Sequence, residues 1–84
     1  MKPKEKLVET IYQTSVWLIS KGLYHNYRCD ELDKYTVYLY CYIKGYEISI
    51  RIRPDITFDT VQFLISKYIY DKTGGNFNGK QYDF

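Results

Sequence analysis

The sequence holds few of the residues from which metal sites, disulfides and chain breaks are made. It has one histidine, two cysteines and two prolines, and it contains no alanine. His25, Cys29 and Cys41 show no paired spacing such as C-x-x-C, so they lack the pattern of a zinc site. The strand register that the sequence predicts places the two thiols at different heights on neighbouring strands, and we expect both to be reduced. No metal and no cofactor is predicted.

Long apolar runs and a strong charge of one sign are also missing. No stretch has the length of a membrane-spanning segment or of the apolar part of a signal peptide, so we expect a cytoplasmic protein with no membrane partner. The formal net charge is only +2. A charge this small does not attract nucleic acid over the whole surface, so a site for a polyanion would have to be a local cluster.

Tyrosine is the residue in excess. The 84 residues include 11 tyrosines, and aromatic residues make up 19% of the chain. The length predicts one hydrophobic core with a net stability of about 5 kcal/mol. Abundant Tyr, Lys, Ile and Asn together with the lack of alanine indicate an AT-rich coding sequence. We therefore hypothesise a low-GC bacterium, a phage or another mobile element as the source, which a GC-rich source locus would refute.

Apolar residues recur at steps of three and four in two segments, which predicts two amphipathic helices. The first covers residues 4–21, between Pro3 and Gly22. Its predicted buried stripe, with Thr14 and Ser15 inside it, consists of Leu7, Val8, Ile11, Tyr12, Leu18 and Ile19. The second follows Pro54, is capped by Asp55 or Thr57 and ends at Gly74 and Gly75. Its predicted stripe consists of Phe58, Val61, Leu64, Ile65, Tyr68 and Ile69.

Residues 35–53 contain two alternating runs joined by Lys44 and Gly45, which predicts a β-hairpin. If Ile43 faces Tyr46, the aliphatic residues form cross-strand pairs on one face, the core face: Cys41 with Ile48, Leu39 with Ile50, and Val37 with Ile52. The other face then pairs Tyr42 with Glu47, Tyr40 with Ser49, Tyr38 with Arg51, and Thr36 with Arg53. Residues 23–29 alternate poorly, so a third strand there is left open.

These elements predict an α+β domain in which two helices pack on one face of a two- or three-stranded antiparallel sheet, in the order α-(β)-β-β-α. The single domain covers residues 1–75, and residues 76–84 form a C-terminal tail or short hairpin that carries Phe77, Tyr82 and Phe84. With a third strand, this order is similar to that of double-stranded RNA-binding domains and of HicA-type toxins. Residues 55–59 lack the basic cluster of the first family, and residues 22–25 lack the Gly-Ser-His signature of the second. Neither family is assigned.

The polar face of the hairpin is the candidate binding site. Its anchors are Tyr38, Tyr40, Tyr42 and Arg51, with Glu47 and Arg53 as a polar rim. Tyr and Arg are enriched at the energetic centres of protein interfaces, which favours a small non-enzymatic interaction protein that binds a larger protein. Combined with the inferred source, this suggests an inhibitor of a nucleic-acid-handling host enzyme. The alternative is RNA or single-stranded DNA binding through the same face, because rings and guanidinium groups also stack on bases. A purely structural role is also open, because tyrosine has high β propensity.

A second candidate surface consists of Trp17, on the polar side of the first helix, and Phe63 with Tyr70, opposite the apolar stripe of the second. It would bind a partner or form a homodimer, unless the C-terminal tail covers it. No catalytic residue is predicted, because no nucleophile with a base, carboxylate pair or phosphate loop stands at a recognisable spacing. His25 as the base of a small ribonuclease is the one catalytic alternative. Asp30, Glu31 and Asp33 are interpreted as a solvated acidic turn rather than a cation site.

Overall fold

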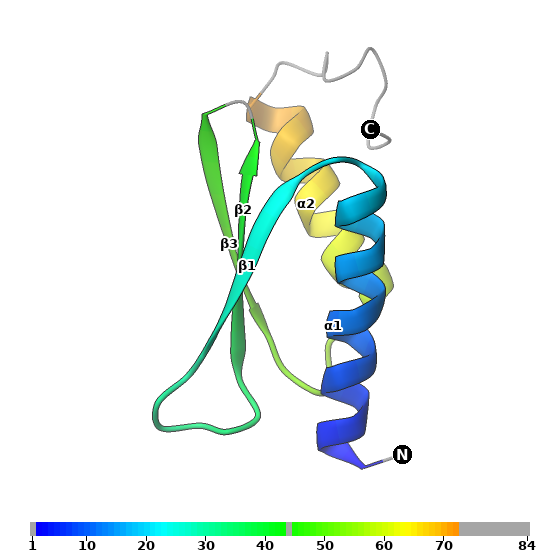
Figure 1. Cartoon of the computed structure of the whole chain (residues 1–84), viewed down its shortest axis with the longest axis vertical. Coiled ribbons are helices and arrows are strands. Elements are labelled where there is room, and N and C mark those ends of the chain that lie inside the picture. Colours follow the sequence, from blue (N-terminus) through cyan, green and yellow to red (C-terminus); the bar gives the residue numbers. More distant parts are fainter. Residues whose placement is uncertain (1, 44, 73–84) are drawn as a thin grey trace.

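The computed structural model describes residues 2–43 and 45–72, which form two helices and three strands in the order α-β-β-β-α (Figure 1). The elements are α1 (Pro3–Ser20), β1 (Tyr24–Cys29), β2 (Val37–Ile43), β3 (Tyr46–Ile52) and α2 (Phe58–Lys72). The predicted α+β class is confirmed, and the third strand that the sequence left open is present as β1. Lys44, the helix end at Gly74 and Gly75, and the tail or hairpin over residues 76–84 lie outside the described residues.

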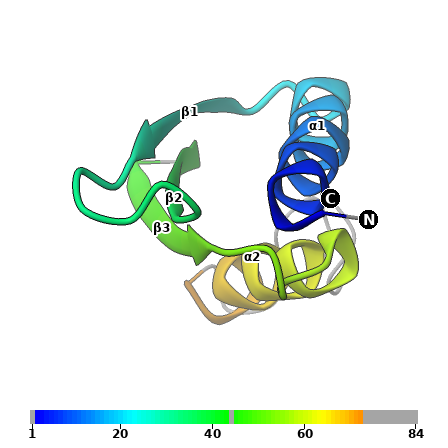
Figure 2. The same cartoon turned by 90° about the horizontal axis from the view of Figure 1, so that it is seen from below.

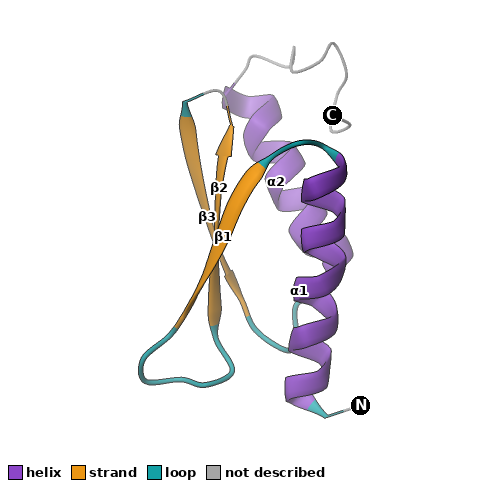
Figure 3. Ribbon diagram, in the orientation of Figure 1, coloured by secondary structure: helices purple, strands orange, loops and turns teal. Residues whose placement is uncertain are grey.

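The three strands form an antiparallel meander in which β2 is central (Figure 3). The register between β2 and β3 is the one that the alternation predicts, from Ile43 opposite Tyr46 to Val37 opposite Ile52. Gly45 has a φ of 84° in the connecting turn, a conformation that glycine adopts without steric cost. Both cysteines are free: Cys29 lies opposite Val37, whereas Cys41 belongs to a different row of the sheet.

Both helices cover the same face of the sheet and leave the opposite face without a helix layer (Figure 2). Packing on the aliphatic face follows from the alternation along the strands. The odd-numbered residues of β2 and the even-numbered residues of β3 point toward the helices, and all of them except Tyr46 are buried. The core consists of Leu7, Leu18, Val37, Leu39, Cys41, Ile43, Ile48, Ile50, Ile52, Val61, Ile65 and Ile69. The predicted two-layer arrangement is thus the observed one.

The buried side of α1 differs from the predicted stripe. Leu7 and Leu18 are buried as predicted, but Val8, Tyr12 and Ile19 are exposed. The predicted stripe was therefore wrong at these three positions. Compared with the predicted orientation, α1 is rotated about its axis, and the side that packs against the rest of the domain is partly polar.

Two threonines lie on the buried side of α1. Thr14 is buried, as its place inside the predicted stripe required, and Thr10 is buried beside it. The Thr10 hydroxyl donates to the carbonyl oxygen of Ile56 at 3.2 Å. Small side chains allow α1 to approach its neighbours closely, and the hydrogen bond compensates for the burial of one hydroxyl. The same rotation turns Trp17 toward the core, where its ring meets Phe58 edge-on with a centroid distance of 6.1 Å. The prediction that Trp17 lies on the polar side of the helix was wrong.

The helix ends follow the predicted signals. Gly22 has a φ of 69° directly after α1, and the N–H of Leu23 donates back to the carbonyl of Leu18 at 3.0 Å, as in a Schellman motif. At the start of α2, the Thr57 hydroxyl accepts a hydrogen bond from the N–H of Thr60 at 3.3 Å. Of the predicted α2 stripe, Leu64 is exposed rather than buried.

Candidate functional site

The face of the sheet opposite the helices carries nine side chains in three rows. They alternate with core residues along each strand, so their position follows from the twofold period of a strand. We call these nine residues the open face: Tyr24, Asn26 and Arg28 from β1, Tyr38, Tyr40 and Tyr42 from β2, and Glu47, Ser49 and Arg51 from β3. The anchors predicted from the sequence are brought together here, and β1 adds three residues that the sequence analysis did not include.

The row nearest the β2–β3 turn is aromatic and acidic. Tyr42 lies between Tyr24 and Glu47, and its ring centroid is 5.4 Å from that of Tyr24. Partial burial and the negative charge of Glu47 raise the pKa of the Tyr42 hydroxyl. This end of the open face therefore carries a neutral aromatic pair beside one carboxylate.

The row at the opposite end is cationic. Tyr38 lies between Arg28 and Arg51, and its hydroxyl donates to the carboxylate of Asp30 at 2.8 Å. That hydrogen bond to a carboxylate raises the pKa of Tyr38 and holds its ring in one orientation. The open face is thus polarised, with Glu47 at one end and two guanidinium groups at the other.

The middle row is flanked by two shallow depressions. Tyr40 lies between Asn26 and Ser49. One depression of about 510 Å³ includes Asn26, Arg28, Tyr40 and Glu47 in its lining. The other, of about 360 Å³, also contacts Arg28 and Tyr40 and extends toward the β1–β2 loop. Tyr40 and Arg28 therefore form a ridge with hollows on both sides, a shape that side chains of a partner can fill.

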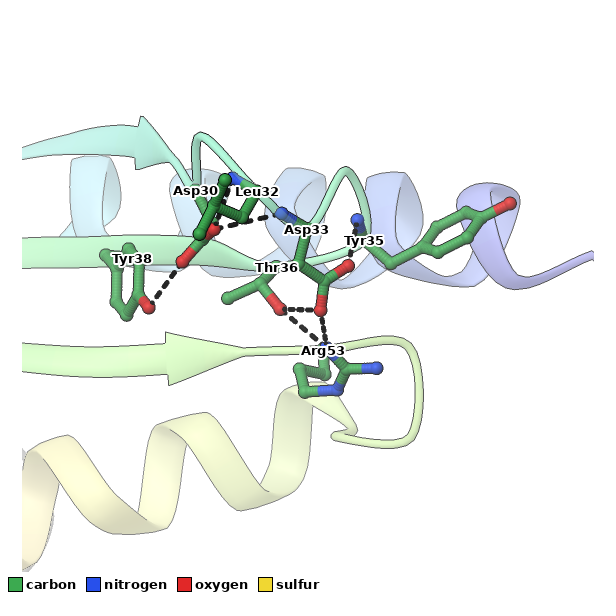
Figure 4. Close-up of polar contacts among 7 residues, drawn as sticks. All are labelled: Asp30, Leu32, Asp33, Tyr35, Thr36, Tyr38 and Arg53. Atoms are coloured by element: carbon green, nitrogen blue, oxygen red, sulfur yellow. Dashed lines mark hydrogen bonds and ion pairs between the residues drawn. The ribbon is translucent and has the colours of Figure 1, made fainter.

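Two carboxylates organise the loop that joins β1 to β2 (Figure 4). Asp30 Oδ1 accepts hydrogen bonds from the N–H groups of Leu32 at 2.8 Å and Asp33 at 2.9 Å. Asp33 in turn accepts hydrogen bonds from the Tyr35 N–H and the Thr36 hydroxyl, at 2.9 and 2.8 Å. Such Asx turns fix a loop through its own backbone. Among the described residues, no three His, Cys, Asp or Glu side chains gather as a metal site would require.

Arg53 is tied to the same loop. Its guanidinium group forms an ion pair with Asp33 and donates to the Thr36 hydroxyl (Figure 4). Arg53 was predicted to lie on the rim of the open face, and in the structure its charge is paired with Asp33. Arg28 and Arg51 are consequently the cations that the sheet itself presents on the open face.

We predict that the Asp33 network makes stability depend on acid pH. Hydrogen bonds from Tyr35, Thr36 and Arg53 lower the pKa of Asp33 from 3.8 to about 2. Because the folded pKa is the lower one, the contribution is complete above pH 3.8 and is lost as pH falls toward 2. Urea unfolding between pH 5 and pH 2 should show a smaller loss of stability in Asp33→Asn than in wild type, since the amide does not titrate. Parallel pH profiles for the two proteins would contradict this assignment.

His25 lies on the helix side of β1 rather than on the open face. Its Nδ1 is 3.2 Å from the carbonyl oxygen of Leu23, and its ring meets that of Tyr27 edge-on at 5.5 Å. Phe63 is exposed and Tyr70 is half-buried on α2, whereas Trp17 packs against the core. The second surface predicted from the sequence therefore does not include an outward-facing Trp17.

No known protein family, curated protein or solved structure matches this chain. Neither of the two described helices has the length and apolar character needed to cross a membrane. Sequence reasoning missed Tyr24, Asn26 and Arg28, because the two sides of this strand differ little in hydropathy and its alternation therefore carries no usable signal.

Proposed function

We propose that this protein is a small non-enzymatic interaction module that binds a larger protein through its open face. The observation that carries the proposal is a sheet with one face buried under two helices and the other lined by four tyrosines and two arginines. Tyrosine offers a large contact area with few rotatable bonds, and arginine combines stacking with several hydrogen-bond donors. Both residues are enriched among interface hot spots, whereas a face with only a solvating role needs neither.

The charge of the open face favours a protein partner over nucleic acid. The charged side chains of the open face are Arg28, Arg51 and Glu47. Arg53 is not counted among them, because its guanidinium group forms an ion pair with Asp33. Affinity for a nucleic-acid backbone comes from several cations that contact phosphates together. A face with two arginines at one end and a glutamate at the other complements a protein surface, which carries both acidic and basic groups, better than it complements nucleic acid.

The role of the complex would be inhibition by steric exclusion. If the composition reflects a phage or another mobile element, a nucleic-acid-handling enzyme of the host is a suitable target, and Tyr40 and Arg51 would be the anchors in its surface. In this proposal Glu47 forms the rim at the acidic end, and Arg53 holds the loop beside the cationic end.

The test compares a variant of the open face with a matched control variant on α1. We expect immobilised wild-type protein and Lys6→Ala/Gln13→Ala, which alters the exposed polar side of α1, to capture the same host protein. The Tyr40→Ala/Arg51→Ala variant should lose it, with a dissociation constant for the purified partner raised at least about 30-fold. Equal capture by all three proteins, or capture of nothing, would reject the proposal.

The dependence of binding on salt concentration distinguishes nucleic-acid binding from protein binding. Fluorescence anisotropy with labelled single- and double-stranded RNA and DNA should show no binding that depends on Tyr40 and Arg51. Binding that these substitutions abolish, and that weakens steeply as salt increases, would instead assign the open face to nucleic acid.

A further inference from the structure

Within residues 2–43 and 45–72, the outer edge of β1 is open for pairing. Among the described strands, β1 pairs with β2 alone. The N–H of Asp30 donates to the carbonyl of Thr36 at 3.0 Å, which makes the even-numbered residues of β1 the hydrogen-bonded partners of β2. The N–H and C=O groups of His25, Tyr27 and Cys29 therefore point toward the outer edge. This edge has no proline, lysine or bulge, three of the devices that prevent another strand from pairing, and its one charged side chain, Arg28, lies on the open face.

The helix layer stops short of this edge. The helix-facing residues of β2, and those of β3 apart from Tyr46, are buried, whereas on β1 His25 and Tyr27 are half-buried and Cys29 is exposed. The opposite edge of the sheet is better covered, because the Tyr68 hydroxyl of α2 donates to the carbonyl of Glu47 at 3.4 Å. On the β1 side, the sheet therefore ends in an unpaired edge and the helix layer leaves the strand partly uncovered.

An exposed apolar stripe on α1 borders the same side. Spacings of four, four and three residues align its members, whose exposed fractions are 56% for Val8, 68% for Tyr12, 51% for Val16 and 68% for Ile19. We call these four residues the α1 stripe. A shallow, mostly apolar depression lies at its N-terminal end and includes Val8 and Tyr12 in its lining.

The α1 stripe lies on the β1 side of the helix. Its neighbours on the helix surface are Ile11 and Ser15, and both contact Tyr27: the two hydroxyl oxygens of Ser15 and Tyr27 are 2.5 Å apart, and the Tyr27 hydroxyl donates to the Ile11 carbonyl at 3.3 Å. The opposite flank of α1, at Trp17, meets α2. In Figure 2, β1 and α1 lie along the upper margin of the molecule, and α2 lies below α1.

We propose that the α1 stripe and the free edge of β1 form one self-association surface, and that a second copy of this chain occupies it. The two β1 strands pair antiparallel about a twofold axis at Asn26 and create a six-stranded sheet. The two α1 helices then lie antiparallel over the junction and bury the α1 stripe of each copy. Antiparallel helices also place the positive end of each helix dipole beside the negative end of the other.

The sequence of β1 is self-complementary in this register, as a twofold interface requires. His25 of one copy forms the hydrogen-bonded pair with Tyr27 of the second copy, so the outward-pointing backbone groups meet. On the other side of the sheet, Tyr24 of one copy lies opposite Arg28 of the second copy, a cation–π pair that occurs twice. No like charges face each other. This complementarity favours a second copy over an unrelated strand.

The dimer would also double the open face. A twofold axis perpendicular to the sheet keeps the same face outward in both copies. The two sets of nine side chains then form one continuous surface, with the paired Tyr24 and Arg28 side chains at its centre. Dimerisation does not require a ligand on the open face, because the self-association surface consists of the β1 edge and the α1 stripe.

Sedimentation equilibrium tests the association. We expect wild-type protein to show twice its monomer mass of 10.1 kDa at concentrations up to about 500 µM. The Tyr12→Glu/Ile19→Glu variant should raise the dissociation constant at least about 30-fold, while the matched Gln13→Glu/Ser20→Glu variant on the polar side of α1 should leave it nearly unchanged. Far-UV circular dichroism confirms that each variant is folded. Wild-type protein that stays monomeric, or an equal effect of both variants, would overturn the proposal.

Disulfide trapping tests the register and does not depend on the helix variants. In a Cys29→Ser background, Asn26→Cys should cross-link rapidly on oxidation, because residues at the twofold axis form a non-hydrogen-bonded pair with Cα atoms about 4.5 Å apart. Ser49→Cys in the same background is the control, since this exposed residue lies on β3, away from the junction. Equal cross-linking rates for the two cysteines would refute pairing through β1.

Discussion

Replacing Leu39 with alanine is expected to lower the free energy of unfolding by about 3 kcal/mol. Leu39 is central in the middle strand, 0% exposed, and lies between Tyr27 on β1 and Ile50 on β3. The substitution leaves a cavity under both helices that the rigid sheet cannot close. Since a domain of this size has a total stability of about 5 kcal/mol, more than half would be lost. Urea denaturation followed by circular dichroism measures the change.

Leu32 provides the control for this prediction. It is the same residue type but 99% exposed in the β1–β2 loop, so Leu32→Ala should change the free energy of unfolding by less than about 0.5 kcal/mol. A similar loss of stability in the two variants would mean that Leu39 does not occupy the core.

The two cysteines are expected to differ at least about 1000-fold in their rates of thiol labelling at pH 8. Cys29 is exposed, whereas Cys41 is 0% exposed and burial raises the pKa of its thiol to about 12. A thiol with that pKa is ionised to only about one part in ten thousand at pH 8. Cys41 should therefore react only when the domain opens. Mass spectrometry of alkylated protein over time would resolve one fast and one slow adduct.

Two variants assign these phases. Cys29→Ser should remove the fast adduct and leave the slow one. Leu39→Ala should accelerate the slow phase by about 150-fold, because a loss of about 3 kcal/mol raises the open population by that factor. Labelling of both cysteines at one rate would contradict the burial of Cys41.

The hairpin of β2 and β3 was predictable in detail. Aliphatic residues alternate with polar ones over Val37–Ile43 and Tyr46–Ile52, and Gly45 marks the turn, so only one register places all the aliphatic side chains on one face. The ends of the helices were also predictable at Gly22 and Thr57, because capping chemistry is local. The α+β arrangement follows from these elements, since one aliphatic sheet face must be covered by both apolar helix sides.

The orientation of α1 was not predictable from its apolar residues. The helix carries enough apolar side chains for two sides, and the one that faces the core includes Thr10 and Thr14. Only the partners on other elements, such as the Ile56 carbonyl that accepts from Thr10, decide which side is buried. The same ambiguity led to the wrong placement of Trp17.

Six of the nine residues of the open face, those of β2 and β3, could be inferred from the hairpin alone. The contribution of β1 could not, because Tyr24–Cys29 contains no aliphatic residue and its two sides look alike in hydropathy. The pairing of Arg53 with Asp33 was also not predictable from the sequence. It joins residues 20 positions apart and depends on how the β1–β2 loop closes.

The order of the strands has a consequence for folding kinetics. Each strand pairs with its neighbour in the sequence, so the whole sheet can be assembled from two successive hairpins. Hairpins form in about 1–10 μs, and a topology made of local pairings has a low contact order. Contacts between the most distant parts of the chain, such as Thr10 with Ile56 and Trp17 with Phe58, form when α1 docks against its second half. The protein can therefore complete its sheet before the costliest loop closure, and the strands spend little time unpaired.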